Sequence, residues 1–140
     1  MMKSLLLGML NSFLGNTSSN GNGHAQDEYG RRTGFSYSTS SGMNMCNDSG
    51  RSIGFTRKSY SGYDVYDEYG SRKASYYKRS DGYDIYDEYG SQTGSIRKAP
   101  DGSLQKYDRY GACTGYIVKD ACGNMIEYDR SGHRIGSFNQ

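Results

Sequence analysis

The chain has 140 residues and a formal net charge of +2, which fits a single domain. Leu, Ile, Val and Phe together number only 18, whereas Gly and Ser number 20 each and Tyr 15, so a Leu- and Ala-rich helical bundle is excluded. No run of about 18 apolar residues exists, which excludes a multi-pass membrane protein. With 17 basic and 15 acidic residues, the charge does not indicate nucleic acid as a partner.

Residues 1–15 hold most of the leucines of the chain. Their apolar side chains recur every three or four residues, as on one face of a helix: Leu6, Met9, Leu10 and Phe13. This pattern predicts a short amphipathic helix whose stripe contacts a membrane surface, a second copy of the chain, or the wide end of its own domain. The alternative is a secretory signal peptide within residues 1–25, with Lys3 as its charged region.

Residues 16–23, Asn-Thr-Ser-Ser-Asn-Gly-Asn-Gly, are typical of a flexible polar linker before a domain that spans residues 24–140. An N-terminal helix that is retained predicts a cytoplasmic or membrane-associated protein. A signal peptide that is cleaved predicts a secreted one.

A repeat of 20 or 21 residues fills the domain, marked six times by Asp-x-x-Gly or its variant Asn-x-x-Gly. The first side chain of this motif suits the capping of backbone N–H groups, and the Gly suits a left-handed conformation. The predicted structural turn residues are Asp27, Gly30, Asn47, Gly50, Asp67, Gly70, Asp87, Gly90, Asp108, Gly111, Asp129 and Gly132. A second turn signal, such as Asp81-Gly82, falls halfway through each unit.

Between the turns lie short stretches of Tyr, Ile, Val, Thr and Ser, which have the residue types and length of strands. The array begins and ends on half-units, which can pair and remove both free edges. The sequence therefore predicts an all-β fold, a closed radial array of about six short β-hairpins. Because no unit can fold alone, we expect a shared core from Ile53, Val65, Ile85, Ile96, Ile117, Ile126 and Ile135.

The recurring Tyr-Asp-x-x-Gly-x-x-Ile/Thr-Gly, as in residues 128–136, resembles the β-flower proteins, bacterial domains of four to six radially arranged β-hairpins. The resemblance covers residues 24–140 and implies a five- or six-fold flower without an established activity. The shape of that family has been likened to the tubby C-terminal domain, which binds phospholipid head groups. The Rhs or YD repeat also carries the motif, but it places an apolar residue two after the Gly, where this chain has Arg32, Ser52, Arg72, Gln92, Cys113 and Arg134.

Motifs for enzymatic chemistry are missing from the sequence, which has no Gly-x-Ser-x-Gly, phosphate-binding loop or His-Glu-x-x-His. His24 and His133 lie apart from any cluster with ligand spacing, and the acidic pairs do not match an EF-hand. We therefore expect no metal, no cofactor and no catalytic activity.

Two sets of tyrosines recur at fixed positions of the repeat. The set before the turn Asp is expected to replace Leu in the core: Tyr66, Tyr86, Tyr107 and Tyr128. The set inside the turns is expected to form an exposed ring, a possible ligand face: Tyr29, Tyr69, Tyr89 and Tyr110. The sequence thus predicts a non-enzymatic interaction module that acts at a membrane surface through its N-terminal helix. The alternative is a secreted or cell-surface protein that binds carbohydrate or another ligand through these tyrosines.

Overall fold

The structure, a computed structural model, describes residues 5–14 and 22–139, with the side chains of 11–14 excepted. The predicted linker therefore lies almost wholly outside the described residues, as does the Phe13 side chain. The elements are η1 (Leu5–Leu14), β1 (Gly23–Asp27), β2 (Arg32–Ser38), β3 (Gly42–Asn47), β4 (Ser52–Ser59), β5 (Gly62–Asp67), β6 (Arg72–Arg79), β7 (Gly82–Asp87), β8 (Gln92–Lys98), β9 (Leu104–Asp108), β10 (Cys113–Lys119), β11 (Met125–Asp129) and β12 (Arg134–Asn139).

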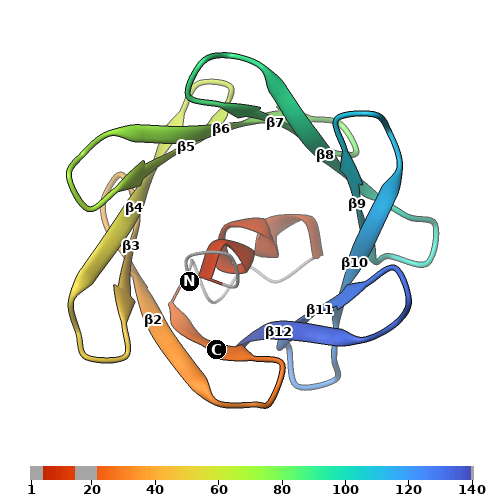
Figure 1. Cartoon of the computed structure of the whole chain (residues 1–140), viewed down its shortest axis with the longest axis horizontal. Coiled ribbons are helices and arrows are strands. Elements are labelled where there is room, and N and C mark those ends of the chain that lie inside the picture. The colour runs from red at the N-terminus through yellow and green to blue at the C-terminus, as the bar shows by residue number, and fades with distance from the viewer. Residues whose placement is uncertain (1–4, 15–21, 140) are drawn as a thin grey trace.

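The twelve strands form one closed antiparallel barrel in which neighbours in the chain are neighbours in the sheet. The ring closes where β1 pairs with β12, with Ala25 opposite Phe138 and Asp27 opposite Gly136. Figure 1 shows the six hairpins arranged around a common axis. The predicted all-β closed array of about six hairpins is therefore confirmed, and the described strands leave no sheet edge free.

Each hairpin turns in the same way. In the turn at Asp67, the side-chain Oδ1 accepts the N–H groups of Tyr69 at 2.9 Å and Ser71 at 3.0 Å, and Gly70 has φ 82°. The same two hydrogen bonds recur at Asp27, Asn47, Asp87, Asp108 and Asp129. The acceptor at the first position and the left-handed Gly at the last position bend the chain here.

The connections between hairpins explain why the repeat length changes from 20 to 21. β4 and β5 are joined by two residues, Tyr60 and Ser61, whereas the loop between β8 and β9 contains residues 99–103. Only Gly fits after the short connection, because a Cβ at Gly62 would lie 1.8 Å from the Tyr76 carbonyl oxygen. The additional residue is accommodated in the loop, so strand pairing continues on both sides of it.

Side chains along each strand alternate between the lumen and the outer wall, and cross-strand partners share a face. The buried residues of the wall that form the core are Ala25, Met43, Met45, Val65, Tyr83, Ile96, Leu104, Ile117, Met125 and Phe138. Of the predicted core set, Ile53 and Ile85 are half-buried against this cluster. Ile126 and Ile135 are half-buried but lie outside it, so their assignment to the shared core is wrong.

The tyrosines before the turn Asp do not fill the core, contrary to the prediction. Tyr66, for example, follows the buried Val65, and alternation therefore turns it to the outer wall, where it is half-buried. Its ring stacks on Phe55 of β4 at a centroid distance of 4.8 Å. Tyr128 stacks on Tyr116 of β10 at 5.2 Å in the same way. These rings stabilise the joins between hairpins from outside.

The N-terminal helix lies within the ring of strands (Figure 1). It is a 3-10 helix, and Leu5, Leu7, Met9 and Leu10 are at most 5 % exposed. Gly8 is also buried, and Leu6 is half-buried. The described side chains of the helix are therefore mostly buried in the lumen, and Met9 and Leu10 of the predicted stripe do not face solvent.

Candidate ligand-binding surfaces

The Asp-x-x-Gly turns form one end of the barrel, here called the tyrosine rim (residues 27–33, 47–53, 67–73, 87–93, 108–114 and 129–135). Four of its turns carry highly exposed rings, between 74 and 87 % accessible: Tyr29, Tyr69, Tyr89 and Tyr110. Ser49 and Ser131 occupy this position in the other two turns. Successive turns are two strands apart, or about 10 Å, so three of the tyrosines follow one another and Tyr29 stands alone.

The turn aspartates of this rim are already engaged. The N–H groups of Ser71 and His133 donate to Asp67 and Asp129 and lower the pKa of both carboxyls. The second oxygen of Asp129 lies 3.3 Å from His133 Nδ1. Among residues 5–14 and 22–139, no group of three or more His, Cys, Asp or Glu side chains gathers as metal ligands. The aspartates therefore serve the turns.

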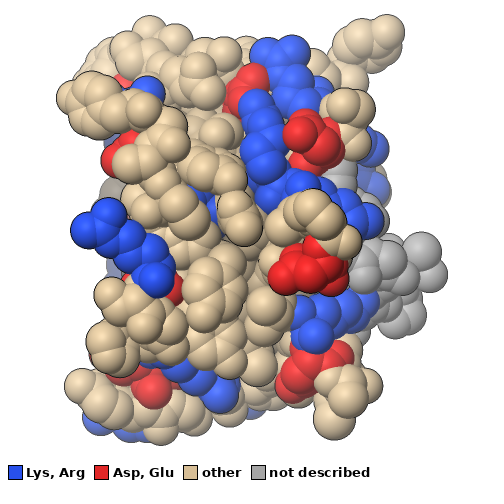
Figure 2. Space-filling model, turned by 90° about the vertical axis from the view of Figure 1, so that its right-hand side faces the viewer, with Lys and Arg blue, Asp and Glu red and all other residues tan. Residues whose placement is uncertain are grey.

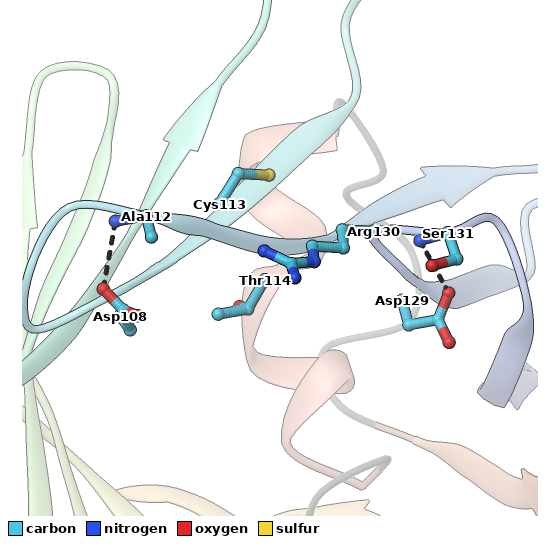
Figure 3. A pocket seen from close by; sticks show the side chains of 7 residues that line it. All are labelled: Asp108, Ala112, Cys113, Thr114, Asp129, Arg130 and Ser131. Atoms are coloured by element: carbon cyan, nitrogen blue, oxygen red, sulfur yellow. Dashed lines mark hydrogen bonds between the residues drawn. The ribbon is translucent and has the colours of Figure 1, made fainter.

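A shallow hollow lies between two successive turns of the tyrosine rim, as Figure 3 shows. Its lining residues are Asp108, Ala112, Cys113, Thr114, Asp129, Arg130 and Ser131. The Arg130 guanidinium extends across it near Thr114 (Figure 3). Both carboxylates hold their own turns, by accepting the N–H groups of Ala112 at 3.0 Å and Ser131 at 2.9 Å. The hollow is therefore lined by polar groups, and both of its carboxylates are engaged in their own turns.

The opposite end of the barrel, here called the lysine rim (residues 38–42, 57–62, 77–82, 97–103 and 118–124), carries a lysine at the same position of four even-numbered strands. Each of these lysines is the cross-strand partner of a lumen residue: Lys58 of Tyr63, Lys78 of Tyr83, Lys98 of Leu104, and Lys119 of Met125. They therefore stand on the lumen side of the wall at the mouth of the barrel. The chain enters β1 at this same end.

The two rims differ in charge. The lysine rim has seven Lys and Arg and three Asp, whereas the tyrosine rim has eight Lys and Arg and nine Asp and Glu. Figure 2 shows basic side chains, with acidic ones among them, gathered towards one end of the molecule. On the outer wall nearby, Asp84 accepts hydrogen bonds from Arg79 at 2.6 Å and Arg97 at 2.5 Å. Although burial opposes its ionisation, the hydrogen bonds from these two arginines lower the pKa of Asp84.

An ion pair lies on the lumen side of the wall. Lys106 Nζ is 2.5 Å from Glu127 Oε2, and Glu127 is only 2 % exposed. The same position holds Ala, Met, Val and Ile in the first four units, at residues 25, 45, 65 and 85. Burial, with a smaller contribution from the Glu127 carboxylate, raises the pKa of Tyr76 to about 12. A buried pair of this kind adds little net stability but is costly to break.

One buried polar atom of the lumen lacks a partner among the described residues. The Thr56 hydroxyl on β4 is fully enclosed and makes no hydrogen bond within that part of the chain. Thr56 pairs with Met43 on one side and Val65 on the other, so it faces the lumen. An unsatisfied buried hydroxyl is uncommon in native proteins.

Sequence analysis placed the turn tyrosines but missed the lysine rim and the buried ion pair. Each of these lysines stands four residues after a small residue of the repeat, namely Gly54, Ala74, Gly94 and Gly115. An alignment of the repeat units by position would therefore have shown the four lysines in one column. The lumen side of Lys106 and Glu127 likewise follows from strand alternation.

No protein-family model matches the chain, and no curated protein matches it. None of the helical segments in the described residues has the length and apolar character needed to cross a bilayer.

Proposed function

We propose that this protein is a non-enzymatic binding module that docks on an anionic membrane surface through the lysine rim. The observation that carries this proposal is the set of four lysines at equivalent positions around one mouth of the barrel. Lysines near an anionic bilayer each contribute about 1 kcal/mol, and a ring of them presents several to one plane. A membrane-associated location inside the cell follows from this proposal.

The N-terminal segment has a second place in this proposal. Leu6, Met9, Leu10 and Phe13 remain candidates for contact with lipid or with another copy of the chain, but the described part of η1 is buried in the lumen. Contact with lipid would therefore require η1 to leave the barrel. The chain enters β1 at the lysine rim, the end that faces the bilayer in this proposal.

Membership in the β-flower family belongs to the same proposal. It is supported by the closed ring of six hairpins and by the shared turn motif. The family itself supplies no activity, so the function rests on the charge of the rim.

Vesicle pelleting tests the docking surface. Lys58→Glu combined with Lys98→Glu should lower binding to phosphatidylserine-containing vesicles by more than about thirtyfold, because two favourable charges of about 1 kcal/mol each are lost and two repulsive charges are added. The matched control, Arg109→Glu with Arg130→Glu, makes the same charge change on the tyrosine rim and should bind nearly as well as the parent. Equal losses of vesicle binding in both double variants would show that binding depends on net charge alone, and would contradict docking through the lysine rim.

The exposed turn tyrosines favour a second candidate, a carbohydrate- or protein-binding face on the tyrosine rim. Exposed aromatic rings at fixed spacing offer stacking surfaces that are rare on ordinary loops. Tyr89→Ala with Tyr110→Ala should abolish binding to any glycan retained on an array. Tyr60→Ala, at an exposed tyrosine on the other rim, should leave it unchanged.

A further inference from the structure

The lumen is too wide for wall side chains to fill by themselves. Side chains fill a barrel of about eight strands, and wider barrels enclose a ligand, a channel or a plug. This barrel has twelve strands, and η1 occupies its interior (Figure 1). A ten-residue 3-10 helix extends about 20 Å, which is close to the height of a wall built from strands of five to eight residues. The segment therefore takes the place of a rod-shaped apolar ligand.

The helix has features of an occupant that can be exchanged. A 3-10 helix of ten residues is unusually long, because its hydrogen bonds are poorly aligned. Its main packing is against β1, β2, β11 and β12, on one side of the wall. The segment is thus held by burial of Leu5, Leu7, Met9 and Leu10 more than by its own conformational preference.

The lumen also has a polar group without a hydrogen-bond partner among the described residues. The Thr56 hydroxyl is buried without a partner in the described chain, and Lys58 stands two residues further along β4 on the same face. The two Cα atoms are therefore about 7 Å apart. A hydroxyl that is buried and has no partner among the described residues, two residues from an exposed lysine on the same face, fits an anionic head group that enters from the lysine rim.

We propose that the lumen binds a single-chain fatty acid, with its carboxylate at Lys58 and Thr56 and its chain in the space that η1 occupies. The proposal deepens the membrane-docking function and rests on it, because the same rim faces the lipid from which the ligand would come. Binding of the chain displaces η1, and the released apolar segment is then free to contact the bilayer. The Thr56 hydroxyl donates to the carboxylate, and the Lys58 ammonium pairs with it.

The test uses the full-length chain and dodecanoate below its micellar concentration. Calorimetric titration should show one site, with much weaker binding of dodecanol, which lacks the charge, and of acetate, which lacks the chain. Thr56→Val should lower the affinity about tenfold through the loss of one hydrogen bond to a charged group. Thr56→Ser should restore it. Lys58→Gln should lower affinity for dodecanoate, while Lys73→Gln, on the tyrosine rim, should not.

Competition with the helix supplies an independent readout. Leu10→Ala weakens the packing of η1 and leaves the wall residues unchanged, so it should raise dodecanoate affinity by at least about tenfold by freeing the binding-competent state. Hydrogen–deuterium exchange of residues 5–14 should become faster when dodecanoate is added. Slower exchange of residues 5–14 would overturn the proposal. So would a dodecanoate affinity that neither Thr56→Val nor Leu10→Ala changes, or the absence of any dodecanoate binding.

The two proposals fail separately. Vesicle binding that depends on the lysine rim, without dodecanoate binding, leaves the docking function and removes the lumen site. Dodecanoate binding with the predicted variant pattern, without vesicle binding, leaves a lumen site that takes its ligand from solution and removes membrane docking.

Discussion

At the scale of single residues, the turn glycines and aspartates determine where the chain reverses. Gly90 has φ 86°, a conformation that side chains with a Cβ rarely adopt, and open space surrounds the position at which a Cβ would stand. Substitution there therefore measures backbone strain without steric clash. The aspartate that opens this turn, Asp87, accepts the N–H groups of Tyr89 and Ser91, each at 2.9 Å.

Gly90→Val should lower the free energy of unfolding by about 1–3 kcal/mol, because a β-branched residue is strained at positive φ. Urea denaturation followed by circular dichroism measures the loss. Tyr89→Val, at the exposed neighbour, should change it by less than about 0.5 kcal/mol. If the two variants lost equal stability, positive φ would not be the reason for Gly at this position.

Acid should destabilise the protein through the turn carboxyls. The folded-state pKa values of Asp67 and Asp129 lie below the ordinary 3.8, so their contribution is present above that pH and is lost as the pH falls through the folded values. Stability measured by urea denaturation should decline below about pH 4. Asp67→Asn with Asp129→Asn should reduce that decline yet keep the turns, since Asn47 already accepts the same two bonds at 3.0 Å. An unchanged acid profile would contradict this assignment.

At the scale of elements, η1 is part of the core and not a detached anchor. Leu10 is 2 % exposed inside the barrel, whereas Leu6 is only half-buried. The spacing of apolar residues predicted a helix with one stripe, but Leu5 and Leu7, outside that stripe, are buried in the barrel as well. Burial in the lumen therefore makes the helix part of the hydrophobic core.

Leu10→Ala should cost about 2–5 kcal/mol of stability, the range for truncating a buried leucine. Leu10→Asp should cost more, because it places a charge among apolar side chains. The midpoint of thermal unfolding measures both, and Leu6→Ala should show a smaller loss. A parent-like melting temperature for Leu10→Asp would mean that the segment does not reside in the lumen in solution.

At the scale of the whole molecule, closure joins the two ends of the repeat array. β1 and β12 pair over four residues, and Phe138 of β12 is completely buried. This pairing joins the half-unit at the start of the array to the half-unit at its end. Removal of either half-unit exposes two strand edges and opens the lumen.

Deletion of residues 136–140 should abolish cooperative thermal unfolding or drive aggregation, since it removes most of β12 and the Phe138 side chain. Size-exclusion chromatography and a circular dichroism melt measure this. Asn139→Ala, which leaves β12 in place, should remain monodisperse. A truncated chain that melted cooperatively within a few degrees of the parent would show that closure is dispensable.

The sequence by itself determined the periodic features of this protein: six turns, twelve short strands and the pairing of the two half-units. Each of these follows from local turn chemistry and from a repeat length that does not depend on distant residues. The tertiary structure decided what the side chains on each face of the strands contact. It placed Tyr66 and Tyr128 outside, brought Lys106 to Glu127 and enclosed η1 in the lumen. The physical reason is that twelve strands close at a radius that wall side chains cannot fill, so a separate apolar segment is required to complete the core.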